Sequence, residues 1–183
     1  MGFESDSDQV EVLCIETATV FLAGEIDDVL SSRVVQAIGR LRAMGKESLT
    51  LLISSPGGSV YAGYAIADAV KAARVAGVEV HGVVTGEAAS AAIFPLLECS
   101  TRQANAMSVL MVHGMTDTVR GDHQDIEAVQ RLNSKMIEQQ ARLLANHTAQ
   151  DAEYWQKILK SRLPQYYLAD EAVAEGLVHD IIQ

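Results

Sequence analysis

The sequence has little cysteine, few basic residues and no long apolar run, and each scarcity excludes a class of protein. Its 183 residues include two cysteines, Cys14 and Cys99, without the spacing of a disulfide framework or a metal site, so we expect two free, buried thiols. Only 14 lysines and arginines stand against 24 acids, a net charge of −10. Such a balance argues against a nucleic-acid binder and against attraction to anionic membranes.

No stretch of about 18 apolar residues occurs, so no membrane span is expected. The acidic start lacks the basic and apolar regions of a secretory signal. We therefore expect a cytoplasmic protein. Residues 1–9 are polar, acidic and aperiodic, which predicts disorder. No repeat or linker divides the remainder, so residues 10–183 are predicted to form a single domain.

Short apolar runs alternate with helical patterns along the chain. Strands are expected at 10–15, 18–22, 49–53, 78–84, 108–112 and 177–182, and helices at 29–43, 61–75, 88–97, 125–147, 151–159 and from 168 to Gly176. The uninterrupted runs 49–53 and 78–84 are typical of strands covered on both faces, and 102–107 is expected to be a connection. The alternation predicts an α/β fold with a largely parallel sheet, whose sites form where strands end.

Ser90 is the leading candidate nucleophile. It lies within Gly86–Ala92, where small residues allow a sharp strand-to-helix turn and a close approach to the hydroxyl. His113 ends a second apolar run and is the best candidate base, since an imidazole shuttles protons near neutral pH. A helix-start serine and a core histidine are the structural alternatives. The remaining histidines, in weaker settings, are His81, His123, His147 and His179.

The glycine pair Gly57-Gly58 follows the run at 49–53 and forms a turn. It lacks the Lys-Ser/Thr of a phosphate-binding loop. A better use is an oxyanion hole, in which a glycine turn frees a backbone N–H and the Ala91 amide supplies the second donor. A tight turn that only needs positive φ is the alternative.

Several motifs, in order, resemble the Clp protease proteolytic subunit family over residues 18–182. They are 52–63, 86–90, Met111-Val112-His113, Asp125-Ile126-Glu127, His147-Thr148 with Gln150, and 171–178. The resemblance implies a serine peptidase with Ser90 as nucleophile, His113 as base and the Gly58 and Ala91 amides as oxyanion hole, without metal or cofactor. It also implies a crotonase-like superhelix of ββα units with a protruding handle helix.

That resemblance further implies an assembly. The helix at 125–147 would join subunits into a heptameric ring or a double-ring tetradecamer that encloses peptide substrates. Its apolar stripe, which includes Leu132 and Met136, fits such a role because its burial requires a partner. An AAA+ unfoldase is a further possible partner, although most of the family's amino-terminal docking segment is missing here.

The family's triad acid has no match in this chain. Counted forward from His147-Thr148 its position falls on Arg162, and counted backward from Gly176 it falls on Pro164. Acids that fit by type alone are Asp117, Asp151 and Asp170. The residues after His113 also depart from the family, which leaves cleavage specificity open.

Three alternatives remain beside a ring-forming peptidase. A catalytically silent scaffold subunit is favoured by the missing acid and disfavoured by Ser90 and His113. An acyl-CoA enzyme of the crotonase superfamily shares the fold but usually uses carboxylates. A Ser–Lys peptidase would need Lys135, which is expected to face outward on the 125–147 helix.

Overall fold

The computed structural model describes residues 12–115, 121–161 and 163–183, so the disorder expected of residues 1–9 lies outside the described residues. The elements are β1 (Leu13–Cys14), β2 (Thr19–Ala23), α1 (Asp28–Ala43), β3 (Ser48–Ser55), α2 (Val60–Val75), β4 (Glu79–Ala89), the 3₁₀ helix η1 (Ser90–Ala92), α3 (Ile93–Leu97), β5 (Thr101–Asn105), β6 (Val109–Val112), α4 (His123–His147), α5 (Ala152–Lys160), β7 (Gln165–Leu168), α6 (Ala169–Glu175) and β8 (Asp180–Ile182).

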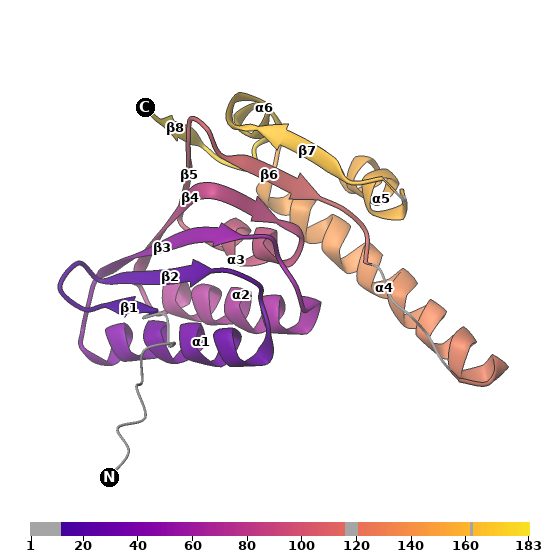
Figure 1. The fold of residues 1–183 in the computed structure, drawn as a ribbon, viewed down its shortest axis with the longest axis horizontal. Coiled ribbons are helices and arrows are strands. Elements are labelled where there is room, and N and C mark those ends of the chain that lie inside the picture. The colour runs from indigo at the N-terminus through magenta and orange to yellow at the C-terminus, as the bar shows by residue number, and fades with distance from the viewer. Residues whose placement is uncertain (1–11, 116–120, 162) are drawn as a thin grey trace, which may run out of the picture.

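The strands form one sheet in the order β1-β2-β3-β4-β5-β8, with β6 branching from β4 and pairing with β7. All neighbours are parallel except β1 with β2 and β6 with β7. Because β2 to β5 follow one another in space as in sequence, right-handed crossovers put α1, α2 and α3 on the same side of the sheet (Figure 1). The predicted α/β superhelix is confirmed.

This one-sided arrangement corrects the expectation that the apolar strands are covered on both faces. In β3, Leu49, Leu51 and Ile53 are buried beneath the helices, whereas Leu52 between them is only half-buried. Val83 of β4 is half-buried in the same way. The second face of the sheet therefore carries apolar side chains that the helices do not cover.

Strand β4 is longer than predicted and changes its neighbour midway. Its first part pairs with β5 at 81–84, and its second part pairs with β6 at 87–89. Gly86, at φ +83°, lies between the two parts. The strand expected to end at 84 therefore reaches Ala89, and the helical region expected from 88 begins at Ser90.

The connection expected at 102–107 is wrong, because β5 occupies most of it. Its polar sequence hides a strand in which Arg102 is buried. The Arg102 guanidinium donates to the backbone carbonyls of His147 at 2.7 Å and Leu177 at 2.9 Å, so its hydrogen-bonding groups are satisfied. Strand β7, also unpredicted, pairs with β6 on its other side.

Helix α4 is the expected protruding helix, and it begins at His123 rather than 125 because Asp122 caps its first turn. Its buried residues lie in its second half: Met136, Gln140, Ala141 and Leu144. The first half projects away from the body of the chain (Figure 1). Leu132 on that half keeps 46% of its surface exposed.

The two cysteines differ. Cys99 is buried as expected, and burial raises the pKa of its thiol to about 12. Cys14 is only half-buried, contrary to expectation, because it lies on the outermost strand β1. In the described part of the chain, no helix combines the length and apolarity needed to cross a membrane.

Candidate active site

Ser90 lies where β4 gives way to η1, as its small neighbours predict. Its φ of +55° is unusual for a residue with a side chain. Ala89 before it and Ala91 after it are buried, whereas Ser90 itself is half-exposed. The turn therefore holds the hydroxyl at the surface of a rigid junction, as nucleophile turns between strands and helices do.

The pairing of β4 with β6 brings His113 to Ser90. Ala89 lies beside Met111 in a parallel register, so the residues that follow each strand emerge at the same edge. His113 Nε2 lies 2.8 Å from Ser90 Oγ. With the imidazole proton on Nδ1, Nε2 accepts the hydroxyl hydrogen, which is the arrangement a general base requires.

The turn after β3 packs against the Ser90 turn through Gly57. A Cβ at Gly57 would lie 2.6 Å from the Ala89 carbonyl oxygen, 2.7 Å from Ser90 Cβ and 2.9 Å from the Ala91 nitrogen. Gly57 also has φ +91°. Glycine is required here both for the backbone conformation and for the close approach.

The backbone N–H groups of Gly58 and Ala91 lie beside these turns and take no part in the hydrogen bonds of the adjacent bridge or helix. The parallel bridge between Ile26 and Gly58 uses the atoms that flank Gly58: Ile26 N donates to Gly57 O at 2.7 Å, and Ser59 N donates to Ile26 O at 2.8 Å. Ala91 is the second residue of η1, and the first N–H groups of a helix have no acceptor within it.

Ser55 organises this turn and is absent from the sequence-based prediction. Its side chain is fully buried, and its hydroxyl donates to Gly24 O at 2.6 Å and accepts from Gly57 N at 3.1 Å. The Gly57 amide is thereby occupied, whereas the Gly58 amide has no acceptor among the residues that the structure describes. A serine two residues before a glycine turn is the signal that predicts this role.

Two hollows border the serine–histidine pair. The wider, of about 260 Å³, includes Gly58, Tyr61 and Asn133, and the narrower, of about 20 Å³, includes Phe94 and Gln140. Among the residues that the structure describes, no carboxylate lines either of them. Within the described ranges, the only hydrogen bond of the His113 imidazole is to Ser90.

Two of the three acids proposed by type, Asp151 and Asp170, do not fill the gap. Asp151 caps α5 by accepting from Tyr154 N at 2.8 Å, and Asp170 is exposed in the first turn of α6. Neither lines the hollows at Ser90. Asp117 and Arg162 lie outside the described residues.

The antiparallel register of β6 and β7 distinguishes the two positions at which an acid was expected. Val112 pairs with Gln165 at the end of the ladder, and the same register extended by one step would set His113 opposite Pro164. On that register, residue 164 is the position from which a side chain would face the imidazole. A proline occupies this position and supplies no acceptor to the Nδ1 side of the ring.

The other ionisable candidates are used elsewhere. Lys135 is exposed on α4, as predicted, and lines neither hollow. His81 contacts Thr101 Oγ1 at 2.8 Å, and His179 Nδ1 accepts from Arg102 N at 3.2 Å. The other two histidines lie beside acids: His123 Nε2 is 3.1 Å from Glu127 Oε1, and His147 Nε2 is 3.9 Å from Glu98 Oε1. Desolvation lowers the pKa of His147 from its ordinary value.

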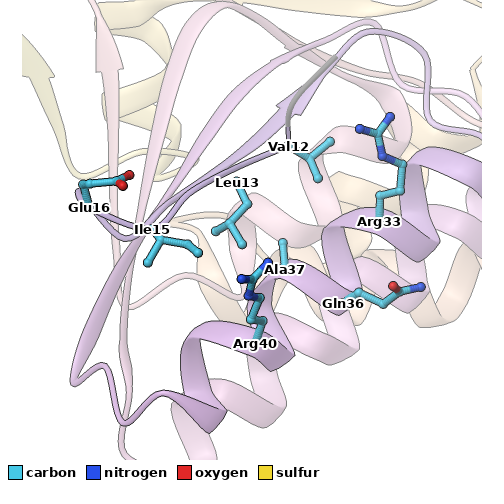
Figure 2. A pocket seen from close by; sticks show the side chains of 8 residues that line it. All are labelled: Val12, Leu13, Ile15, Glu16, Arg33, Gln36, Ala37 and Arg40. Atoms are coloured by element: carbon cyan, nitrogen blue, oxygen red, sulfur yellow. The ribbon is translucent and has the colours of Figure 1, made fainter. Parts of the chain in front are cut away.

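A hollow of about 410 Å³ lies apart from this site, between β1 and α1 (Figure 2). Figure 2 shows Leu13 of β1 facing Ala37 and Arg40 of the helix. As far as the structure describes the chain, its lining includes the carboxylate of Glu16 but no serine, threonine, cysteine, lysine or histidine. This lining lacks a nucleophile paired with a base, which the Ser90 edge has, so that edge is the candidate active site. Among the described residues, no three histidines, cysteines or acids gather as a metal site would require.

An α/β superhelix that carries a serine–histidine pair at the carboxyl ends of its strands has the parts of a hydrolytic enzyme. The family model described as Clp protease matches residues 4–183, and the chain belongs to this family. Membership implies a peptidase. The chain is also 31% identical over 169 residues to the ATP-dependent Clp protease proteolytic subunit 3 of Rhodococcus jostii (strain RHA1). The aligned residues cover 90% of this chain and 80% of that protein.

Replacing Gly57 by alanine tests the close approach of the two turns. Gly57→Ala is expected to lower the rate at which a fluorophosphonate labels Ser90 by on the order of 10², the usual effect of disturbing an oxyanion donor. The matched control is Gly77→Ala, which has a similar φ of +88° but open space around its Cβ. Both variants should lose about 1 kcal/mol of stability to backbone strain. Intact mass measures the labelling rate of each variant. Equal rates for Gly57→Ala and Gly77→Ala would contradict the role given to Gly57.

Proposed function

We propose that the chain is a serine-type endopeptidase that hydrolyses peptide bonds of unfolded proteins or peptides. The supporting observation is the 2.8 Å contact between His113 Nε2 and Ser90 Oγ. As Oγ bonds to the carbonyl carbon, Nε2 takes its proton, and the proton passes to the amine when the C–N bond breaks. Water activated by the same imidazole then hydrolyses the ester on Ser90.

The Gly58 and Ala91 amides are the proposed oxyanion hole. Support comes from two features: both N–H groups lie outside the bonding of their bridge or helix, and the Gly57 contact joins their two turns. Donors fixed before the reaction stabilise the negative oxygen of the tetrahedral intermediate without reorganisation.

The proposed catalytic unit is a Ser90–His113 dyad. Loss of the acid from a triad lowers kcat by about 10⁴ in proteases that depend on it, because the imidazole is no longer held in its reactive tautomer. With Pro164 opposite His113, slow chemistry is expected from this chain. A scaffold subunit without activity is the second candidate, and it is favoured because none of the described residues that line the site is a carboxylate.

The proposed assembly is a heptameric ring, or two rings stacked through α4, enclosing the Ser90 sites. The name of the Rhodococcus relative, a proteolytic subunit, supports an assembled enzyme. Leu132 on the projecting half of α4 and the uncovered Leu52 and Val83 of the sheet are apolar surfaces that subunit contacts would cover. An AAA+ unfoldase that delivers unfolded chains is part of the same proposal.

Labelling with a fluorophosphonate tests the nucleophile and the base together. Wild type should gain one label per chain, and Ser90→Ala should gain none. His113→Ala should react at least about 10²-fold more slowly, since a general base contributes 10² to 10⁴. Label on Ser90→Ala would exclude Ser90 as the nucleophile. A wild type that stays unlabelled would favour the scaffold function.

Restoring an acid opposite His113 tests the dyad. Pro164→Asp should accelerate labelling at least about tenfold, because directly opposed Cβ atoms lie about 4.5–5.5 Å apart and a carboxylate there reaches Nδ1. Pro164→Asn has the same shape without the charge and should give little gain. If the two variants react equally fast, the missing acid is not what limits the imidazole. Thermal unfolding of both variants checks that the loop remains folded.

Native mass spectrometry tests the assembly. Seven or fourteen chains of 19.7 kDa are expected in one particle. Leu132→Asp should split a double ring into single rings by placing a charge in the α4 contact, whereas Ser134→Asp adds the same charge at an exposed neighbour and should leave it intact. A monomeric wild type would contradict the assembly without bearing on Ser90.

A further inference from the structure

The two hollows at Ser90 differ in what they offer a substrate. The wider one includes Gly58 and the narrower one includes Ala91, so the two proposed oxyanion donors lie one at each hollow. The narrower one excludes Gly58 and is walled by buried apolar side chains, among them Ile93, Phe94 and Leu144. An acyl group on Ser90 that directs its oxygen toward Gly58 therefore has the narrow hollow available for its side chain.

Gln140 is a buried polar side chain in the lining of the narrow hollow. It reaches the hollow from α4 and keeps only 2% of its surface exposed. Its Nε2 donates to the Tyr64 hydroxyl at 2.8 Å, and the Tyr64 ring packs against Phe94 with centroids 5.0 Å apart. Moving Gln140 aside would break its hydrogen bond to the half-buried Tyr64 hydroxyl, and this cost holds the carboxamide in place.

About 20 Å³ of space remains in the narrow hollow, which is little more than one water molecule needs. A methyl or hydroxymethyl group fits such a space. A leucine or phenylalanine side chain fits only if close-packed walls shift, and overpacked sites resist this.

We propose that the narrow hollow receives the side chain of the residue whose carbonyl is attacked, and that Gln140 restricts that residue to glycine, alanine or serine. This inference rests on the function proposed above and adds its substrate class. Gln140 acts here as a specificity-determining residue that shapes the site without taking part in proton transfer.

Two tripeptide phosphonates that differ only in their last residue, alanine or leucine, provide the test. Both phosphonylate an activated serine, and intact mass gives the rate for each. Wild type should react with the alanine probe at least about tenfold faster, since side-chain size in an apolar pocket is worth 10- to 200-fold per methylene. Gln140→Ala should reduce this preference at least about tenfold. Gln139→Ala, the same change at the exposed neighbouring position, should leave it unaltered.

A wild type that reacts with the leucine probe as fast as with the alanine probe overturns the inference and leaves the peptidase proposal intact. An unchanged preference in a folded Gln140→Ala overturns the role of Gln140. The wild-type ratio requires no variant, so misfolding of Gln140→Ala does not prevent the test. If neither probe nor a small fluorophosphonate labels Ser90, the proposed function fails and the inference falls with it.

Discussion

The site depends on the approach of Gly57 to the backbone that carries Ser90. Any side chain at 57 would collide with the Ala89 carbonyl and with Ser90 Cβ, so the ends of β3 and β4 meet only because that position is a glycine. Ser55 fixes the same turn, because its hydroxyl oxygen accepts a hydrogen bond from Gly57 N. The Gly58 amide and the Ser90 hydroxyl then belong to one packed unit, whose geometry follows from the backbone rather than from flexible side chains.

A feature of the fold or the site was predictable from the sequence where neighbouring residues alone determine it, and not where distant contacts do. The turn at Ser90 was predictable because the small residues around it mark a sharp strand-to-helix junction, and its role as nucleophile stays a prediction. The strand before it was predicted too short, because a glycine such as Gly86 usually marks the end of a strand. In the structure β4 continues past Gly86 and pairs with β5 before it and with β6 after it. Strand β5 was missed because buried Arg102 resembles a surface residue until its carbonyl acceptors, distant in sequence, are known.

The missing acid shows the same division between local and distant information. Counting along the sequence leaves Arg162 and Pro164 equally placed, since each count crosses a region of uncertain length. The β6–β7 register selects Pro164 because pairing in an antiparallel ladder fixes which residues oppose each other. Strand β7 itself escaped prediction, since Tyr166 and Leu168 are exposed and its only buried side chain is Tyr167.

These features bear on the choice between peptidase and scaffold. A subunit that only completes a ring gains nothing from a serine at φ +55°, a conformation that costs about 1–3 kcal/mol and persists only where the surroundings enforce it. At this same turn the hydroxyl lies 2.8 Å from His113 Nε2, and Gly57 packs against the backbone. Without a triad acid, an oxyanion hole and substrate binding still give about 10³- to 10⁴-fold catalysis over water. In the ring chamber proposed above, peptides would be retained, and turnover that slow would still degrade them. A missing carboxylate would therefore reduce the expected rate without removing the function of the site.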